Sequence, residues 1–240
     1  MRKAFEIGGY VAAVVLVAFG IASIVMGING HNTVNSTLSN EQITGTPDMT
    51  PSGIAAEITA DQAAQTKLIA QMKAAGVTIT PSPITTPSCS VAGKPVDSGT
   101  TARCFADYMR VHTFAATSGL TYSQMGQYQA LGTAPLKTTD GLGGTSDTQY
   151  AVLDPKTQQP VSNGRRDLWV TYTSLTTALN TSYMASQLSL FGIVVGIALL
   201  LSGLGFAILT IFGALGNRST EKPVPTTVAP TVTGTPLPTA

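Results

Sequence analysis

Two long apolar runs lie near the two ends of the chain. Residues 7–28 form the first run and residues 188–215 form the second, and neither contains an Asp, Glu, Lys or Arg. A helix needs about 20 apolar residues to cross the hydrocarbon core of a bilayer. We therefore predict two transmembrane helices, at 7–28 and 188–215. They enclose a central region, residues 29–187.

The residues that precede the second apolar run keep a helical spacing. Steps of four, three, four and seven residues separate Leu168, Tyr172, Leu175, Leu179 and Ser186. These steps place the five side chains on one face of a helix. We expect a single helix from about Arg165 to Leu215, of which the first part is an extramembrane stalk and the second part crosses the membrane.

The rest of the central region predicts shorter elements. Apolar residues at helical spacing indicate helices from Thr50 to Gly76 and from Arg103 to Thr117. Turn-forming residues indicate two short β-hairpins, at 89–96 and 150–161. The expected fold is a mainly α membrane protein with a small α-rich domain between the spans, carrying these two hairpins.

The positive charges near the termini predict the orientation of the chain. Arg2 and Lys3 precede the first apolar run, and Arg218 and Lys222 follow the second. Lys and Arg are enriched on the cytoplasmic flanks of spans. We expect residues 1–6 to be cytoplasmic and residues 29–187 to be extracytoplasmic in the cell membrane.

The first run is longer than the apolar part of a cleavable signal peptide, which indicates a signal anchor; a cleaved signal is the alternative. Residues 216–240 are rich in Thr and Pro and predict a disordered cytoplasmic tail.

The low charge of the chain bears on which kinds of molecule it can bind. Charged residues make up only 10% of the chain, and the net charge is +1. The central region contains nine Lys or Arg and ten Asp or Glu residues, so it carries no excess of positive charge that would attract nucleic acid. The expected partners are the lipid bilayer and a protein, or another copy of the chain.

The two cysteines, Cys89 and Cys104, both lie in the central region. An even number of cysteines on the oxidising side of a membrane indicates a disulfide. We predict a Cys89–Cys104 bond. Two free thiols would be expected only if this region were cytoplasmic.

Small residues follow one side of the second predicted span. Gly192, Gly196, Gly203 and Ala207 would allow another helix backbone to approach closely. That helix is either the first span of the same chain or a helix of a second copy or partner. Neither span contains an ionisable side chain of the kind that transporters use, which argues against a proton or ion pathway.

The histidines give little support for catalysis. His31 and His112 are the only two, and no metal or nucleophile motif surrounds them. We therefore expect no catalytic residue, no bound metal and no cofactor. A possible ligand or partner surface is formed by the aromatic residues of the central region together with one histidine: Phe105, His112, Phe114, Trp169 and Tyr172.

Four segments resemble an uncharacterised family of two-span membrane proteins from actinobacteria. They are residues 45–51 (GTPDMTP), 104–113 (CFADYMRVHT), 121–126 (TYSQMG) and 191–196 (FGIVVG). The resemblance covers about residues 1–215 and leaves the tail outside. Members are often labelled aromatic ring-opening dioxygenase. Such an activity needs Fe(II) held by two His and one carboxylate, so both histidines of this chain would have to bind the metal.

The sequence thus favours a non-enzymatic cell-envelope membrane protein. Its extracytoplasmic domain would bind a protein partner or associate with another copy. One alternative is an extracytoplasmic ligand-sensing or solute-binding protein, which a cavity lined by the aromatic residues would favour. The other alternative is the dioxygenase activity that the family label implies.

Overall fold

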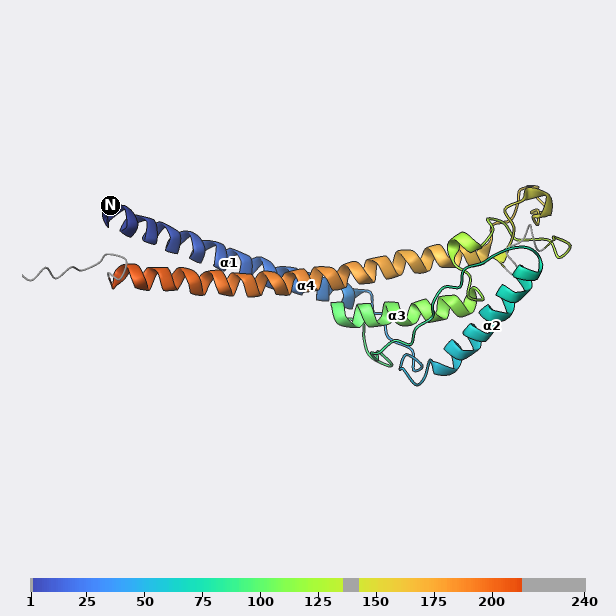
Figure 1. The fold of residues 1–240 in the computed structure, drawn as a ribbon, viewed down its shortest axis with the longest axis horizontal. Helices are drawn as coiled ribbons and strands as arrows, with labels where there is room; N and C mark the ends of the chain where they lie inside the picture. The colour runs from blue at the N-terminus through green and yellow to red at the C-terminus, as the bar shows by residue number, and fades with distance from the viewer. Residues whose placement is uncertain (1, 136–142, 213–240) are drawn as a thin grey trace, which may run out of the picture. The chain divides into compact units, whose positions relative to one another are not determined.

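The structure is a computed structural model that describes residues 2–135 and 143–212. Its helices are α1 (Arg2–Asn40), α2 (Ala55–Ala74), α3 (Gly99–Ala116) and α4 (Gly164–Ile211), with short 3-10 helices η1 (Tyr122–Gln124) and η4 (Thr148–Tyr150) (Figure 1). The predicted tail, 216–240, and the last residues of the second predicted span lie outside the described residues.

Helices α1 and α4 contain the two apolar runs. Both are long and apolar enough to cross a membrane. Their large apolar side chains are largely uncovered: Met26 is 74% exposed and Phe191 is 63% exposed. Side chains of this kind are suited to lipid rather than water. The mainly α fold and the two apolar helices predicted from the sequence are confirmed, and α4 runs without a break from its stalk into the apolar run.

The chain divides into two units, Gly20–Ala198 and Met1–Phe19 with Leu199–Ala240. Within the first unit, α1 and α4 pack antiparallel. The Ser23 hydroxyl donates to the carbonyl of Gly192 at 2.7 Å. A Cβ atom at Gly196 would lie 2.8 Å from the carbonyl oxygen of Gly20 and 2.9 Å from the backbone nitrogen of Ile24. Backbones this close require glycine.

The second unit repeats this close approach. A Cβ atom at Gly203 would lie 2.9 Å from the backbone nitrogen of Val17 and 3.0 Å from the carbonyl oxygen of Ala13. Ala207 is half-buried. In each unit, the small-residue side of α4 therefore lies against α1 of the same chain.

The hydrophobic core of residues 20–198 lies largely between α2, α3 and the first part of α4. Helix α3 runs antiparallel to α4, because Gly99 packs on Tyr183 while Phe114 packs on Trp169 (Figure 1). Helix α2 packs on the other side of α3. The core includes Tyr108 and Phe114, both fully buried. Residues 75–98 return the chain from the end of α2 to the start of α3.

The start of α3 is set by a serine that the sequence pattern did not single out. The Ser98 hydroxyl accepts from the backbone N–H of Thr101, and the Thr101 hydroxyl accepts from the backbone N–H of Ser98. This capping box satisfies two N–H groups that a helix start leaves without partners. Helix α3 therefore begins at Gly99, four residues before the predicted Arg103.

The predicted disulfide is confirmed. Cys89 and Cys104 are joined, with 6.0 Å between their Cα atoms. The bond ties the segment before α3 to the second turn of that helix. The buried Tyr108 hydroxyl, one turn further along α3, donates to the carbonyl of Cys89 at 2.6 Å. Two links therefore hold the same segment against α3.

The two predicted β-hairpins are wrong, since residues 2–135 and 143–212 contain no strand. Residues 89–96 turn at Ala92–Gly93, but their backbone pairs with the chain after α1: Gly93 donates to Gly45, and Val96 donates to Ile43. Residues 150–161 form a turn with one internal bridge, between Leu153 and Pro160, and a second bridge joins Ala151 to Ala130. In the first case pairing with a distant segment replaces the local pairing, and in the second the bridges are isolated and do not form a strand.

Candidate functional site

The aromatic residues proposed as a binding surface are mostly parts of the core. Phe114 is fully buried, and Phe105 and Tyr172 are each 8% exposed. Trp169 joins them through edge contacts, with ring centroids 5.3 Å from Phe114 and 5.5 Å from Tyr172. Trp169 also lines a surface hollow. The interior around the aromatic residues is therefore packed.

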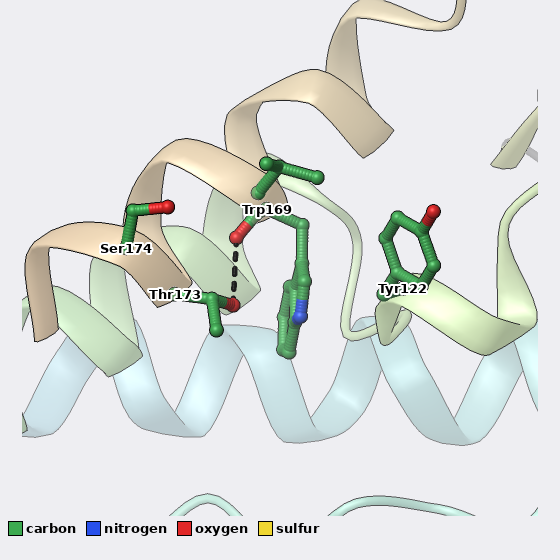
Figure 2. A pocket seen from close by; sticks show the side chains of 5 residues that line it. Tyr122, Trp169, Thr173 and Ser174 are labelled. Atoms are coloured by element: carbon green, nitrogen blue, oxygen red, sulfur yellow. Dashed lines mark hydrogen bonds between the residues drawn. The ribbon is translucent and has the colours of Figure 1, made fainter. Parts of the chain in front are cut away.

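The hollow at Trp169 is open, apolar and about 320 Å³ in volume. Figure 2 shows the indole projecting from α4 on one side and the Tyr122 ring on the other, with Thr173 and Ser174 along the α4 edge. Val170 completes the lining and is 47% exposed. The Thr173 hydroxyl donates to the Trp169 carbonyl at 2.9 Å.

A capping arrangement places Tyr122 beside α4. The backbone N–H of Thr121 donates to the Gln124 side chain at 2.9 Å, which shapes η1. The Gln124 amide also donates to the carbonyl of Thr80 at 2.7 Å and anchors η1 to the segment after α2. The guanidinium carbon of Arg166 lies 4.0 Å from the Tyr122 ring centroid. A cation over a ring face is attracted by its electrons, so Arg166 stabilises this position of Tyr122.

A second, more polar hollow of about 210 Å³ adjoins the first. Tyr122 and Val170 line both hollows, and the second adds Gln127, Arg166 and Asp167. Asp167 accepts from the Ser162 hydroxyl at 2.9 Å. We call the two hollows together the Tyr122 surface. It presents apolar side chains next to a guanidinium group, a combination that is enriched in protein–protein interfaces.

His112 lies away from this surface, between two carboxylates. Its Nε2 atom is 3.2 Å from Oδ2 of Asp48, and its Nδ1 atom is 3.1 Å from Oε1 of Glu57. A neutral imidazole has one donor nitrogen and one acceptor nitrogen, so only the imidazolium form can donate to both carboxylates. The three side chains are each partly exposed, and they join α3, α2 and the turn that precedes α2.

A third carboxyl group, Asp61, follows Glu57 one turn along α2. It is 9% exposed, and its buried Oδ2 atom has no hydrogen-bond partner. Burial raises its pKa to about 6, and the charge of Glu57 adds to this effect while His112 opposes it. The pKa of Asp48 is instead lowered, chiefly because the Thr46 side chain hydrogen-bonds to the carboxylate.

The two histidines do not share a site. The Nε2 atom of His31 lies 3.2 Å from the Asn35 amide, and its Nδ1 atom lies 3.4 Å from the Ser186 hydroxyl. These partners belong to α1 and α4, whereas those of His112 are Asp48 and Glu57. The arrangement therefore argues against the two-histidine iron site that a ring-opening dioxygenase needs.

Sequence reasoning missed most of the residues that the structure brings together. Tyr122, Val170 and Arg166 come from two segments about 45 residues apart, and a spacing pattern could not pair them. The helical repeat of α2 does place Glu57 and Asp61 on one face, which was an available signal. Neither a known protein family, nor a characterised protein, nor a solved structure matches the chain.

Proposed function

We propose that this chain is a two-span cell-envelope membrane protein whose extracytoplasmic region binds a protein through the Tyr122 surface. The open apolar hollow beside Arg166 supports this function most. A small ligand is usually enclosed on most sides, whereas an open hollow of this size fits an apolar side chain of a protein partner. Phe114 and Tyr172 are themselves buried in the core, which supports a partner bound at the open hollow over a solute bound among these rings.

The orientation is part of the proposal. The Cys89–Cys104 disulfide is expected in an oxidising compartment, which supports a position of the region between the spans outside the cytoplasm. The Lys and Arg residues at both ends of the chain favour cytoplasmic termini. A reporter fused after residue 240 that is active only in the cytoplasm would agree with this orientation. Labelling of both cysteines in intact cells without prior reduction would contradict it.

The Tyr122 surface also indicates the chemistry of the partner. The edge of the Arg166 guanidinium group can donate to a carboxylate while the face of the group remains over the Tyr122 ring. An apolar side chain entering the hollow beside Trp169 would then lie next to an acidic group of the partner. We propose a protein segment that presents an apolar residue followed by Asp or Glu. The partner would bind non-covalently, and the proposed function includes no catalytic step.

Photo-crosslinking in native membranes tests the proposal. A benzoylphenylalanine replaces Val170, and the matched control carries the same probe at Ala178, an exposed α4 position outside the hollow. We expect a protein adduct from position 170 that is absent from position 178, with the partner identified by mass spectrometry. An adduct with a second copy of the chain would identify self-association. Equal adducts from both positions, or none from position 170, would contradict the proposal.

A further inference from the structure

The cluster around His112 contains more acidic groups than its histidine can pair. His112 is placed between Asp48 and Glu57, and one ligand atom from each of the three residues lies within 4.8 Å of the others. Carboxylate oxygens and an imidazole nitrogen are both ligands of divalent transition metals. These groups alone could equally form a solvated ion pair. The assignment therefore depends on what else faces them.

Asp61 supplies that second observation. Glu57, Asp61 and Gln65 follow one another at intervals of four residues, so they lie on the same face of α2. Glu57 contacts His112, and Gln65 donates to the carbonyl of Gly119 at 3.0 Å. Asp61 lies between these two contacts and is therefore directed into the same α2–α3 interface. Its Oδ2 atom is buried there without a partner.

A buried carboxylate without a donor is costly, because water is removed from the charge and nothing replaces it. Two further carboxylates stand beside it, and His112 can supply at most one positive charge to all three. A divalent cation held by Asp48, Glu57 and His112 would supply two positive charges to this group of carboxylates. The protein ligands within reach of one ion are two carboxylates and one imidazole, and the partial exposure of Asp48 leaves room for water.

We propose that Asp48, Glu57 and His112 bind one divalent transition-metal ion beside the unpartnered carboxyl group of Asp61, with Zn²⁺ the best match. Calcium prefers a shell of oxygen ligands alone, whereas an imidazole nitrogen with carboxylate oxygens suits zinc. The metal would take the place of the proton on one ring nitrogen of His112. The carboxylate that faces this nitrogen would then lose its hydrogen bond to the ring. The ion would hold α2, α3 and the turn at Asp48 together. The metal site shares no residue with the Tyr122 surface, so neither proposal depends on the other.

The test uses the full-length protein in detergent, freed of metal with a chelator and titrated with Zn²⁺ by calorimetry. We expect one Zn²⁺ per chain, and at least a tenfold loss of affinity in both His112→Gln and Glu57→Gln. His31→Gln is the matched control, because that histidine lies outside the cluster, and we expect unchanged affinity. Absence of stoichiometric binding, or binding that only His31→Gln weakens, would overturn the proposal.

A measurement on the unaltered protein keeps the proposal testable if a variant fails to fold. Diethyl pyrocarbonate modifies histidine rings, and mass spectrometry reports His31 and His112 separately. Zn²⁺ is expected to slow the modification of His112 severalfold and to leave His31 unchanged. Equal rates at His112 with and without Zn²⁺ would contradict the site.

Discussion

Gly196 of α4 lies so close to Ile24 of α1 that a Cβ atom on the glycine would stand 2.9 Å from the Ile24 backbone nitrogen. In a bilayer, helices associate through this kind of backbone proximity, because burial of apolar side chains away from lipid provides little driving force. The contact explains why small residues follow one side of α4. It also identifies α1 of the same chain as an occupant of that side near Gly196.

Substitution of Gly196 by Ala tests this contact. The methyl group cannot fit without separating the two backbones, so we expect a loss of about 1–3 kcal/mol in stability. Gly205→Ala is the control, because no atom lies within 4 Å of its Cβ position. Both changes raise helix propensity equally. Thermal unfolding in detergent should show a lower Tm for Gly196→Ala alone, and equal Tm values would contradict the close packing.

The disulfide and Tyr108 act on the same segment, so their effects can be compared. Removal of a bond that closes a loop of about 15 residues costs about 3 kcal/mol in the chain-entropy model. Replacement of both cysteines by Ser should therefore lower the midpoint of urea unfolding.

Tyr108→Phe removes one hydrogen bond to Cys89 and should cost about 1 kcal/mol. Trp169 is the only tryptophan and reports unfolding through its fluorescence. A Tyr108→Phe protein as stable as the unaltered one would contradict the role of the hydroxyl.

The raised pKa of Asp61 predicts how stability depends on pH when metal is absent. The folded state keeps the Asp61 proton up to about pH 6, whereas the unfolded chain releases it near pH 3.8. The folded state binds more protons between these values, so this group makes the free energy of unfolding fall as pH rises from about 4 to 6. Its effect is constant above that range.

Asp61→Asn should remove this contribution. Unfolding followed by Trp169 fluorescence in the presence of a chelator measures the difference. We expect the Asn variant to gain stability relative to the unaltered protein as pH rises from 4 to 6, because it carries no buried charge. A difference in stability that does not change with pH over this window would show that Asp61 has an ordinary pKa.

The helical elements followed from the sequence because each rests on local spacing. The steps from Leu168 to Ser186 predicted a helix continuous with the apolar run, and α4 has that course. Gly76 has a φ of +80° and lies just after the end of α2, as its sequence position indicated. The hairpin at 89–96 could not be judged locally, since its backbone donors find acceptors at Ile43 and Gly45.

The candidate sites depend on contacts between segments that are far apart in the chain, and local spacing carries no information on the distance between such segments. His112 and Glu57 are 55 residues apart, and they meet because α2 and α3 pack together. Tyr122 reaches Arg166 only because η1 lies beside the start of α4. The aromatic spacing correctly marked side chains that avoid water, but it could not separate the buried Phe114 from the surface-facing Trp169.

The central claim is that the Tyr122 surface binds a protein, and Val170→Glu tests it most directly. Val170 is 47% exposed, so a carboxylate there should leave the fold intact while placing charge in the apolar hollow. Ala178→Glu adds the same charge at an exposed α4 position outside the hollow. The measurement is the amount of crosslink-identified partner that co-purifies with each full-length variant from native membranes. The account predicts at least a tenfold decrease for Val170→Glu and none for Ala178→Glu, and equal recovery with both variants would contradict it.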